Sequence, residues 1–261
     1  MTARLICGEL DRSGDQVAQR ALQLAGGLAR LGVEDGDVIA VMLRNGPVFI
    51  DAIQSCQTAG CFYCPINWHF KADEVAFLLQ DSGAKVLLVE ADLLGEIARV
   101  VPAGVVVLVN GASAALIAGA LPYEAWLSEQ SPYVGEPRTP RAHMAYTSGT
   151  TGRPKGVKRL APPAEEREAM AASMRELSRA AWGIEPGVRT LVSAPLYHSA
   201  PSSFAQQSIL QAELMVVMPR FDAEQTLALI EQYRIDTVFL VPIMYVRLLR
   251  LPAEIRARYD L

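Results

Sequence analysis

The segment at residues 146–157 holds the densest group of side chains that could do chemistry in this 261-residue sequence. It reads Tyr-Thr-Ser-Gly-Thr-Thr-Gly-Arg-Pro-Lys-Gly-Val. Its glycines let backbone N–H groups approach an anion, and its hydroxyls add further donors. Positive charge comes from Arg153 and Lys155. The combination predicts a loop that wraps a polyphosphate, and we call residues 146–157 the phosphate-loop segment.

This segment does not follow the Walker A pattern of P-loop ATPases and kinases. That pattern needs four residues between its first glycine and a Gly-Lys-Ser/Thr sequence. Here two residues separate Gly149 from Gly152, and Lys155 is followed by Gly156. A plain flexible linker is also a poor match, because a linker does not need the Arg-Pro-Lys-Gly sequence near the end of the segment.

Charge and composition restrict the class of protein. Six basic and no acidic side chains lie between residues 138 and 160, although the whole chain has a net charge of −4. Positive charge therefore gathers at the phosphate-loop segment, while the overall acidity argues against a nucleic-acid partner. Hydrophobic residues make up 51% of the chain, which is enough for a sizeable core. We find no signal peptide or membrane span, and expect a globular cytoplasmic protein.

The cysteines raise the question of a metal or redox site. Cys61 and Cys64 have the required spacing, but no second Cys pair or His pair completes a zinc site. We expect both to be small core residues in a reducing compartment, and we assign no metal ligand.

Helices and strands are expected to alternate along the chain and to position the loop. Helical spacing of apolar residues predicts helices at 16–31, 47–59, 72–82, 164–181, 202–211, 223–233 and 242–250. Short apolar runs predict strands at 38–43, 86–90, 105–109, 142–146, 190–194, 214–218 and 237–241. This alternation predicts βαβ units and an α/β fold with helices on both faces of the sheet. The Pro- and Ser-containing stretch 128–140 is a candidate lobe boundary.

The phosphate-loop segment resembles the phosphate-binding signature of the adenylate-forming, or AMP-binding, superfamily, which includes acyl-CoA synthetases, luciferases and peptide-synthetase adenylation domains. Residues 195–201, Pro-Leu-Tyr-His-Ser-Ala-Pro, resemble the substrate-gate motif of the acyl-CoA synthetase branch. Further similarity to this branch lies at 28–43, 59–67, 74–85 and 221–242. The resemblance implies the layered α/β sheets of an N-terminal AMP-binding domain over residues 1–261, without the C-terminal domain.

Membership of this branch implies a two-step reaction. A carboxylate attacks the α-phosphate of ATP and releases pyrophosphate, and the thiol of CoA then attacks the acyl-adenylate. The implied cofactors are ATP and Mg²⁺, with CoA as co-substrate, and the implied partner is a small carboxylic acid of the fatty, bile-acid or aryl class. The resemblance assigns the β- and γ-phosphates to Thr147, Ser148, Gly149, Thr150, Thr151, Gly152 and Lys155.

The same resemblance assigns His198, in the gate motif, to the bound carboxylate, which its imidazole would orient against ATP. The alternative is that His198 only satisfies a turn between Pro195 and Pro201. Six apolar residues would line an acyl pocket if the alignment holds, or would otherwise be core: Val238, Leu240, Val241, Ile243, Met244 and Tyr245.

Several motifs of the family do not occur in these 261 residues. They are the Tyr-Gly-x-Thr-Glu stretch that supplies a magnesium ligand, the aspartate for the ribose and the adenylation lysine. We therefore expect the principal Mg²⁺ ligand in a missing part, and little acyl-adenylate formation by this chain alone. The alternative function is a truncated nucleotide- or acyl-binding module without turnover. Whether the protein forms a homodimer does not follow from the sequence.

Overall fold

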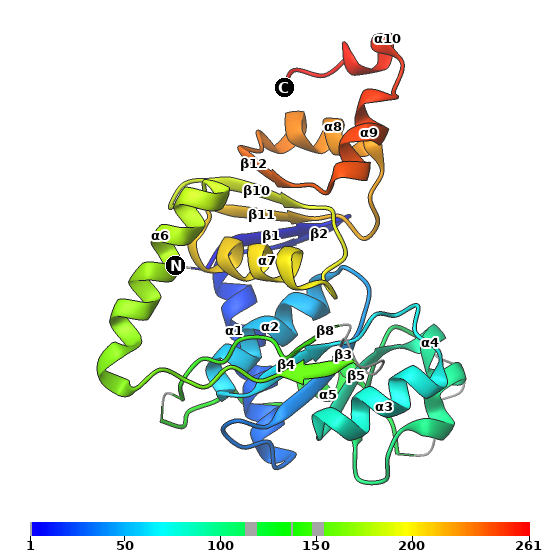
Figure 1. Cartoon of the computed structure of the whole chain (residues 1–261), viewed down its shortest axis with the longest axis vertical. Helices are drawn as coiled ribbons and strands as arrows, with labels where there is room; N and C mark the ends of the chain where they lie inside the picture. Colours follow the sequence, from blue (N-terminus) through cyan, green and yellow to red (C-terminus); the bar gives the residue numbers. More distant parts are fainter. Residues whose placement is uncertain (1, 113–118, 137, 148–153) are drawn as a thin grey trace.

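A computed structural model describes residues 2–112, 119–136, 138–147 and 154–261, and its centre is a pair of five-stranded sheets (Figure 1). The first sheet contains β1 (Arg4–Cys7), β2 (Leu10–Arg12), β10 (Arg189–Val192), β11 (Leu214–Val217) and β12 (Thr237–Phe239), in the order β12-β10-β11-β1-β2. The second contains β3 (Val38–Met42), β4 (Phe62–Pro65), β5 (Val86–Glu90), β6 (Val106–Asn110) and β7 (Leu121–Pro122), in the order β4-β3-β5-β6-β7. All neighbouring strands in the two sheets are parallel except β1 and β2.

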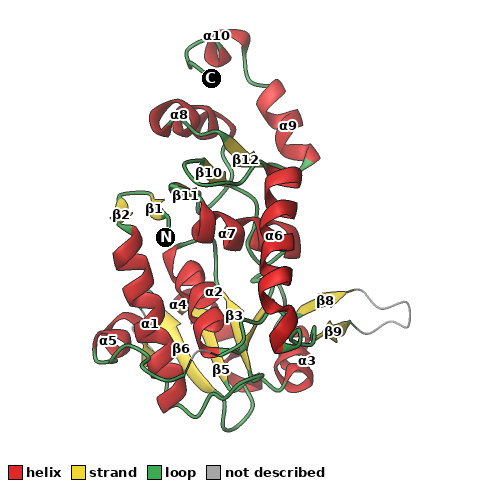
Figure 2. Ribbon diagram, turned by 90° about the vertical axis from the view of Figure 1, so that its left-hand side faces the viewer, coloured by secondary structure: helices red, strands yellow, loops and turns green. Residues whose placement is uncertain are grey.

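Helices separate and cover the two sheets, as Figures 1 and 2 show. The layer between the sheets contains α1 (Gly14–Arg30), α2 (Pro47–Ala59) and α7 (Ser199–Gln211). The outer face of the second sheet packs against α3 (Ala72–Ser82) and α4 (Ala91–Ile97), and that of the first against α8 (Ala223–Tyr233). The remaining helices are α5 (Tyr123–Ser128), α6 (Arg167–Trp182), α9 (Pro242–Leu249) and α10 (Ala253–Arg256), with 3-10 turns at Ala98–Val100 and Ala164–Glu166.

The continuous apolar strands follow from this layering. Every residue of β3 is buried. Ile39 and Val41 pack into the core of the central layer, whereas Val38, Ala40 and Met42 pack into the core under α3 and α4. Because successive strand residues point to opposite faces, a strand covered on both sides has no position left for a polar side chain.

Local signals explain where the central helices begin and end. Ser13 and Gln16 form a reciprocal capping box at the start of α1. Pro47 opens α2, and Gly60 ends it with a φ of 66°, in the left-handed region that glycine adopts without strain.

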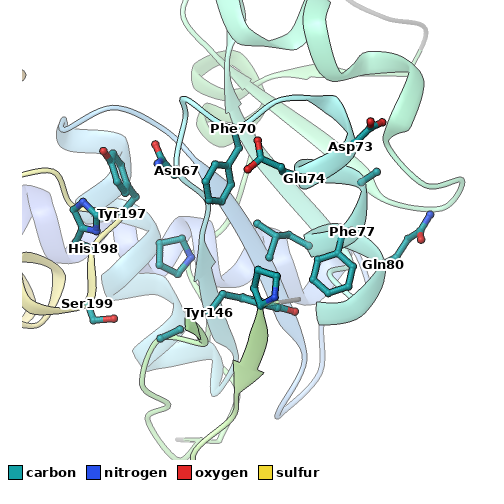
Figure 3. Close-up of a pocket in the computed structure, with 15 residues that line it drawn as sticks. Asn67, Phe70, Asp73, Glu74, Phe77, Gln80, Tyr146, Tyr197, His198 and Ser199 are labelled. Carbon is teal, nitrogen blue, oxygen red and sulfur yellow. The ribbon is translucent and has the colours of Figure 1, made fainter. Parts of the chain in front are cut away.

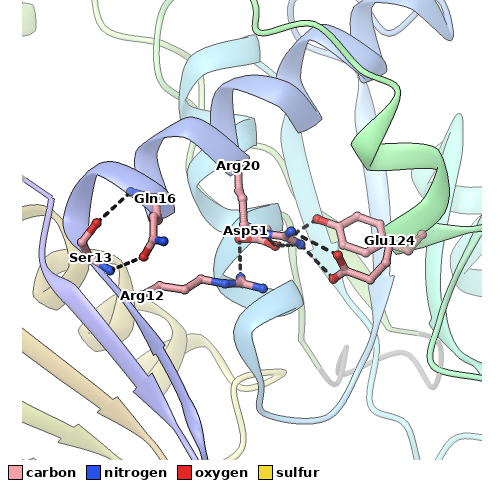
Figure 4. Close-up of polar contacts among 7 residues, drawn as sticks. Arg12, Ser13, Gln16, Arg20, Asp51 and Glu124 are labelled. Atoms are coloured by element: carbon pink, nitrogen blue, oxygen red, sulfur yellow. Dashed lines mark hydrogen bonds and ion pairs between the residues drawn. The ribbon is translucent and has the colours of Figure 1, made fainter.

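A buried carboxylate joins three helices and a strand at one side of the central layer (Figure 4). Asp51 of α2 has a fully buried side chain and accepts a 2.9 Å hydrogen bond from Arg20 Nε of α1. Its other oxygen lies 3.5 Å from Arg12 Nη1 of β2. Arg20 continues to Glu124 of α5, and Tyr123 donates its hydroxyl to Asp51 at 3.1 Å. A buried charge needs such partners, so this cluster fixes the helices to one another.

The structure confirms the predicted α/β fold with layered sheets and helices on both faces. The helices expected at 72–82 and 223–233 have those bounds. Apolar periodicity does not predict the short strands β1, β2, β4 and β7, because two to four residues give little periodicity to detect. The buried, free cysteines at 61 and 64 confirm their assignment to the core.

Two residues of the stretch 128–140 contact the central helices. Tyr133 N donates to Leu22 O of α1 at 2.9 Å, and Arg138 Nη1 donates to Ala59 O of α2 at 2.9 Å. A lobe boundary there stays a prediction. In the part of the chain that is described, no helix combines the length and apolar character of a membrane span.

Candidate active site

A two-stranded hairpin carries the phosphate-loop segment. Its strands are β8 (Ala145–Thr147) and β9 (Lys155–Val157), which pair antiparallel with Thr147 opposite Lys155. The predicted phosphate-binding residues at the two ends of the loop therefore lie side by side, and Lys155 is exposed. The other five predicted phosphate-binding residues lie outside the described residues: Ser148, Gly149, Thr150, Thr151 and Gly152.

Tyr146 attaches this hairpin to α3. Its hydroxyl donates a 2.7 Å hydrogen bond to Asp81 Oδ2, and its ring meets that of Phe77 edge to face, with 6.4 Å between centroids. Burial and the hydrogen bond to Asp81 raise the pKa of the Tyr146 phenol, so it stays a donor. Gly156 lies beneath this ring, since a Cβ there would stand 2.9 Å from Tyr146 Cζ.

The gate segment, residues 195–201, lies beyond the carboxyl end of β10 and leads into α7. His198 is the N-cap residue of α7, with an extended backbone. It is exposed, but its ring packs on that of Tyr197 with 4.5 Å between centroids. Partial burial lowers the pKa of the His198 imidazole, which favours the neutral form at pH 7.

A cavity of about 860 Å³ brings the hairpin and the gate segment together (Figure 3). The hairpin contributes Ala145, Tyr146 and Pro154, and the gate segment contributes Tyr197, His198 and Ser199. The opposite wall comes from β4, the loop after it and α3, including Asn67, Phe70, Asp73, Glu74, Phe77 and Gln80. The structure thus places His198 in the same cavity as Tyr146 and Pro154, which directly precede Thr147 and Lys155, although more than forty residues of sequence separate them.

The structure corrects one expectation about the basic residues near the loop, and the expected acyl pocket stays a prediction. The basic residues near the loop do not all serve it, because Arg138 bonds backbone carbonyls and Arg141 pairs with Asp35 at 2.7 Å. None of the six residues proposed for an acyl pocket lines this cavity, and Ile243 and Tyr245 are more than half exposed. Nothing in the sequence predicts the hydrogen bond between Tyr146 and Asp81, because it depends on which face of α3 meets the hairpin.

The family implied by the resemblance uses Mg²⁺, a cation that takes oxygen ligands. Among residues 2–112, 119–136, 138–147 and 154–261, no three His, Cys, Asp or Glu side chains gather in position to hold a metal ion. Because Mg²⁺ bound with a nucleotide takes only one or two protein carboxylates beside phosphates and waters, the expected magnesium site stays a prediction, and we derive no step through the ion.

Two stacked, mostly parallel sheets with helices between and outside them, and a cavity between the hairpin and the turn that follows β10, define a layered α/β protein. The model of the family described as AMP-binding enzyme matches residues 4–261, and the chain belongs to this family.

Two of its relatives are named as ligases of a carboxylic acid. The chain is 29% identical over 246 residues to the fatty acid–[acyl-carrier-protein] ligase ScoC of Streptomyces coeruleorubidus, covering 93% of this chain and 46% of the relative. It is 30% identical over 247 residues to the indoleacetate–CoA ligase of Aromatoleum aromaticum, covering 90% and 45%. The crystal structure of the Brucella canis acyl-CoA synthetase superposes with a TM-score of 0.82 at 22% identity, covering 99% of this chain and 48% of that one. The chain thus spans about half the length of these relatives.

Proposed function

We propose that this protein supplies the phosphate- and carboxylate-holding part of an ATP-dependent acyl-CoA ligase. The observation that carries the proposal is the cavity that His198 shares with Tyr146 and Pro154, the residues directly before Thr147 and Lys155. Membership of the AMP-binding family and the similarity to acid-activating ligases support it.

In the proposed reaction, the hairpin and His198 have different roles. The acid's carboxylate oxygen attacks the α-phosphorus of ATP, and the bond to the pyrophosphate oxygen breaks. The hairpin holds the β- and γ-phosphates through the loop's N–H and hydroxyl groups and through Lys155, because negative charge on them must be stabilised as pyrophosphate leaves. The neutral imidazole of His198 orients the carboxylate. CoA thiol then displaces AMP. The acid is of the fatty, bile-acid or aryl class.

Calorimetric titration of the 261-residue chain with ATP tests the phosphate site. We expect binding that weakens about tenfold in Lys155→Ala, the effect of losing about 1.4 kcal/mol of interaction. The double variant Thr150→Ala/Thr151→Ala should weaken it as well. Lys158→Ala is the matched control, since Lys158 is an exposed lysine just beyond β9. Unchanged ATP affinity in Lys155→Ala and in the threonine variant would refute the assignment.

A nucleotide- or acyl-binding module of the same fold without turnover is the alternative. ATP–pyrophosphate exchange with a panel of fatty, bile and aryl acids separates the two. Acid-dependent exchange by the chain indicates a ligase, whereas ATP binding without exchange is the result expected of the module. Because the later motifs of the family do not occur in these 261 residues, we expect little or no exchange by the chain alone, and robust exchange would contradict this expectation.

A further inference from the structure

The gate segment is attached to the second sheet by the side chain of Asn45, which lies between β3 and α2 and is only 9% exposed. Its Nδ2 donates to Ala194 O at 2.9 Å and to Met218 O at 3.1 Å. Its Oδ1 accepts from Leu196 N at 2.8 Å. Both N–H groups of this amide therefore donate, and its oxygen accepts one hydrogen bond.

These three bonds connect strand ends that belong to different sheets. Asn45 follows β3 of the second sheet, whereas Ala194 and Met218 follow β10 and β11 of the first. Ala194 and Leu196 also flank Pro195, where the gate segment begins. An amide suits this place because it donates twice and accepts at once, which neither a carboxylate nor an apolar side chain can do.

Tyr63 of β4 makes a second attachment. Its hydroxyl lies 2.9 Å from Ser202 Oγ in the first turn of α7, and both residues are fully buried. Ser202 N in turn donates to His198 O at 3.1 Å. On its other side, the backbone oxygen of Tyr63 accepts from Met144 N at 2.8 Å, directly before β8. One residue thus contacts both the helix that His198 caps and the strand that enters the phosphate loop.

We propose that Asn45 and Tyr63 are positioning residues, which hold the gate segment against the second sheet so that His198 stays in the cavity beside the hairpin. Neither residue lines that cavity. That the position of His198 matters for the reaction rests on the proposed function, in which His198 orients the carboxylate. The placement itself can be measured without any ligand or turnover.

Ring signals in nuclear magnetic resonance spectra test the proposal, since the chain has only three histidines. Asn45→Asp keeps the shape and the acceptor for Leu196 but removes both donors and sets a carboxylate against two carbonyl oxygens. We expect the His198 ring signal, identified by its loss in His198→Gln, to move while those of His69 and His143 stay. Amide exchange at Leu196 and Ser202 should become about tenfold faster, equivalent to about 1.4 kcal/mol of local destabilisation.

The matched control is Gln23→Glu, which makes the same change of amide to carboxylate in α1. Gln23 Nε2 also donates to a backbone oxygen, that of Gln130 at 3.3 Å. We expect an unmoved His198 signal in this control. A folded Asn45→Asp protein with an unmoved His198 signal and unchanged exchange at Leu196 would overturn the proposal.

Asn45→Asp is uninformative if it does not fold or if all three histidine signals move. In that case Tyr63→Phe tests the proposal, because it removes only the hydroxyl that meets Ser202. A moved His198 signal, with that of His69 as the internal reference, supports the proposal, and an unmoved one overturns it. Failure of the wild-type chain to bind ATP would instead refute the proposed function. It would leave the result on the position of His198 intact.

Discussion

Tyr146 donates its hydroxyl to Asp81 at 2.7 Å, and this bond joins the strand before the phosphate loop to the helix that forms the far wall of the cavity. A two-stranded hairpin is marginal by itself in water. The hairpin here gains an anchor from one polar contact and from the edge of Phe77 against the Tyr146 ring. The base of the loop is thereby fixed relative to α3.

The pair formed by Tyr146 and Asp81 should show a measurable coupling energy. In a double-mutant cycle of Tyr146→Phe and Asp81→Ala, we expect each single variant to lower the free energy of unfolding by about 1 kcal/mol, with the double variant costing less than their sum. Urea denaturation measures all four proteins. Strict additivity would show that the bond contributes nothing to stability.

Gly156→Ala should disturb the hairpin, because the added Cβ would meet the Tyr146 ring and the end of the Met144 side chain. We expect a loss of about 1–3 kcal/mol in unfolding free energy, as for overpacked sites, together with weaker ATP binding. Gly95→Ala in α4 is the control. A Cβ at Gly95 has nothing within 4 Å, and alanine favours a helix, so this variant should be neutral or slightly more stable. Equal stability of the two variants would contradict the close approach at Gly156.

Asp51→Asn should destabilise the whole central layer. The change leaves the guanidinium groups of Arg12 and Arg20 without their shared buried carboxylate. We expect the free energy of unfolding to fall by about 3–5 kcal/mol in urea or thermal denaturation.

The matched control for Asp51→Asn is Asp92→Asn. Asp92 pairs with Arg44 at 2.8 Å, but its side chain is 64% exposed. Exposed ion pairs contribute little, so this variant should change stability by less than about 1 kcal/mol. A comparable loss in both variants would mean that burial of Asp51 is not what makes its contacts important.

The imidazole of His198 should titrate below the ordinary histidine value of about 6.5. Partial burial beside Tyr197 disfavours the charged form and lowers its pKa. The unfolded chain then binds this proton more readily than the folded one. The contribution of His198 to stability is therefore complete above about pH 6.5 and is lost as the pH falls through the folded pKa. A titration of the His198 ring signal from pH 8 to pH 5 measures the midpoint, and one at or above that of an unfolded peptide would contradict the expectation.

Local patterns along the chain were enough to predict the class of fold and the residue types of the candidate site. Alternating apolar runs and helical stretches predicted an α/β protein, because strand and helix periodicity is a local property. The phosphate-loop segment and the gate segment could be recognised as continuous stretches, and their resemblance pointed to the family that the comparisons confirm. The roles assigned to Thr147, Lys155 and His198 stay predictions.

Which distant residues support these stretches depends on how the chain packs in three dimensions. Asn45 and Leu196 meet because two separate sheets place their strand ends together, and Tyr63 of the second sheet contacts Ser202 of α7 in the layer between the sheets. No spacing along the chain encodes such contacts, since they depend on how whole sheets and helices pack. The relative position of His198 and the loop is therefore a property of the packed layers, whereas the chemistry available there is a property of the sequence.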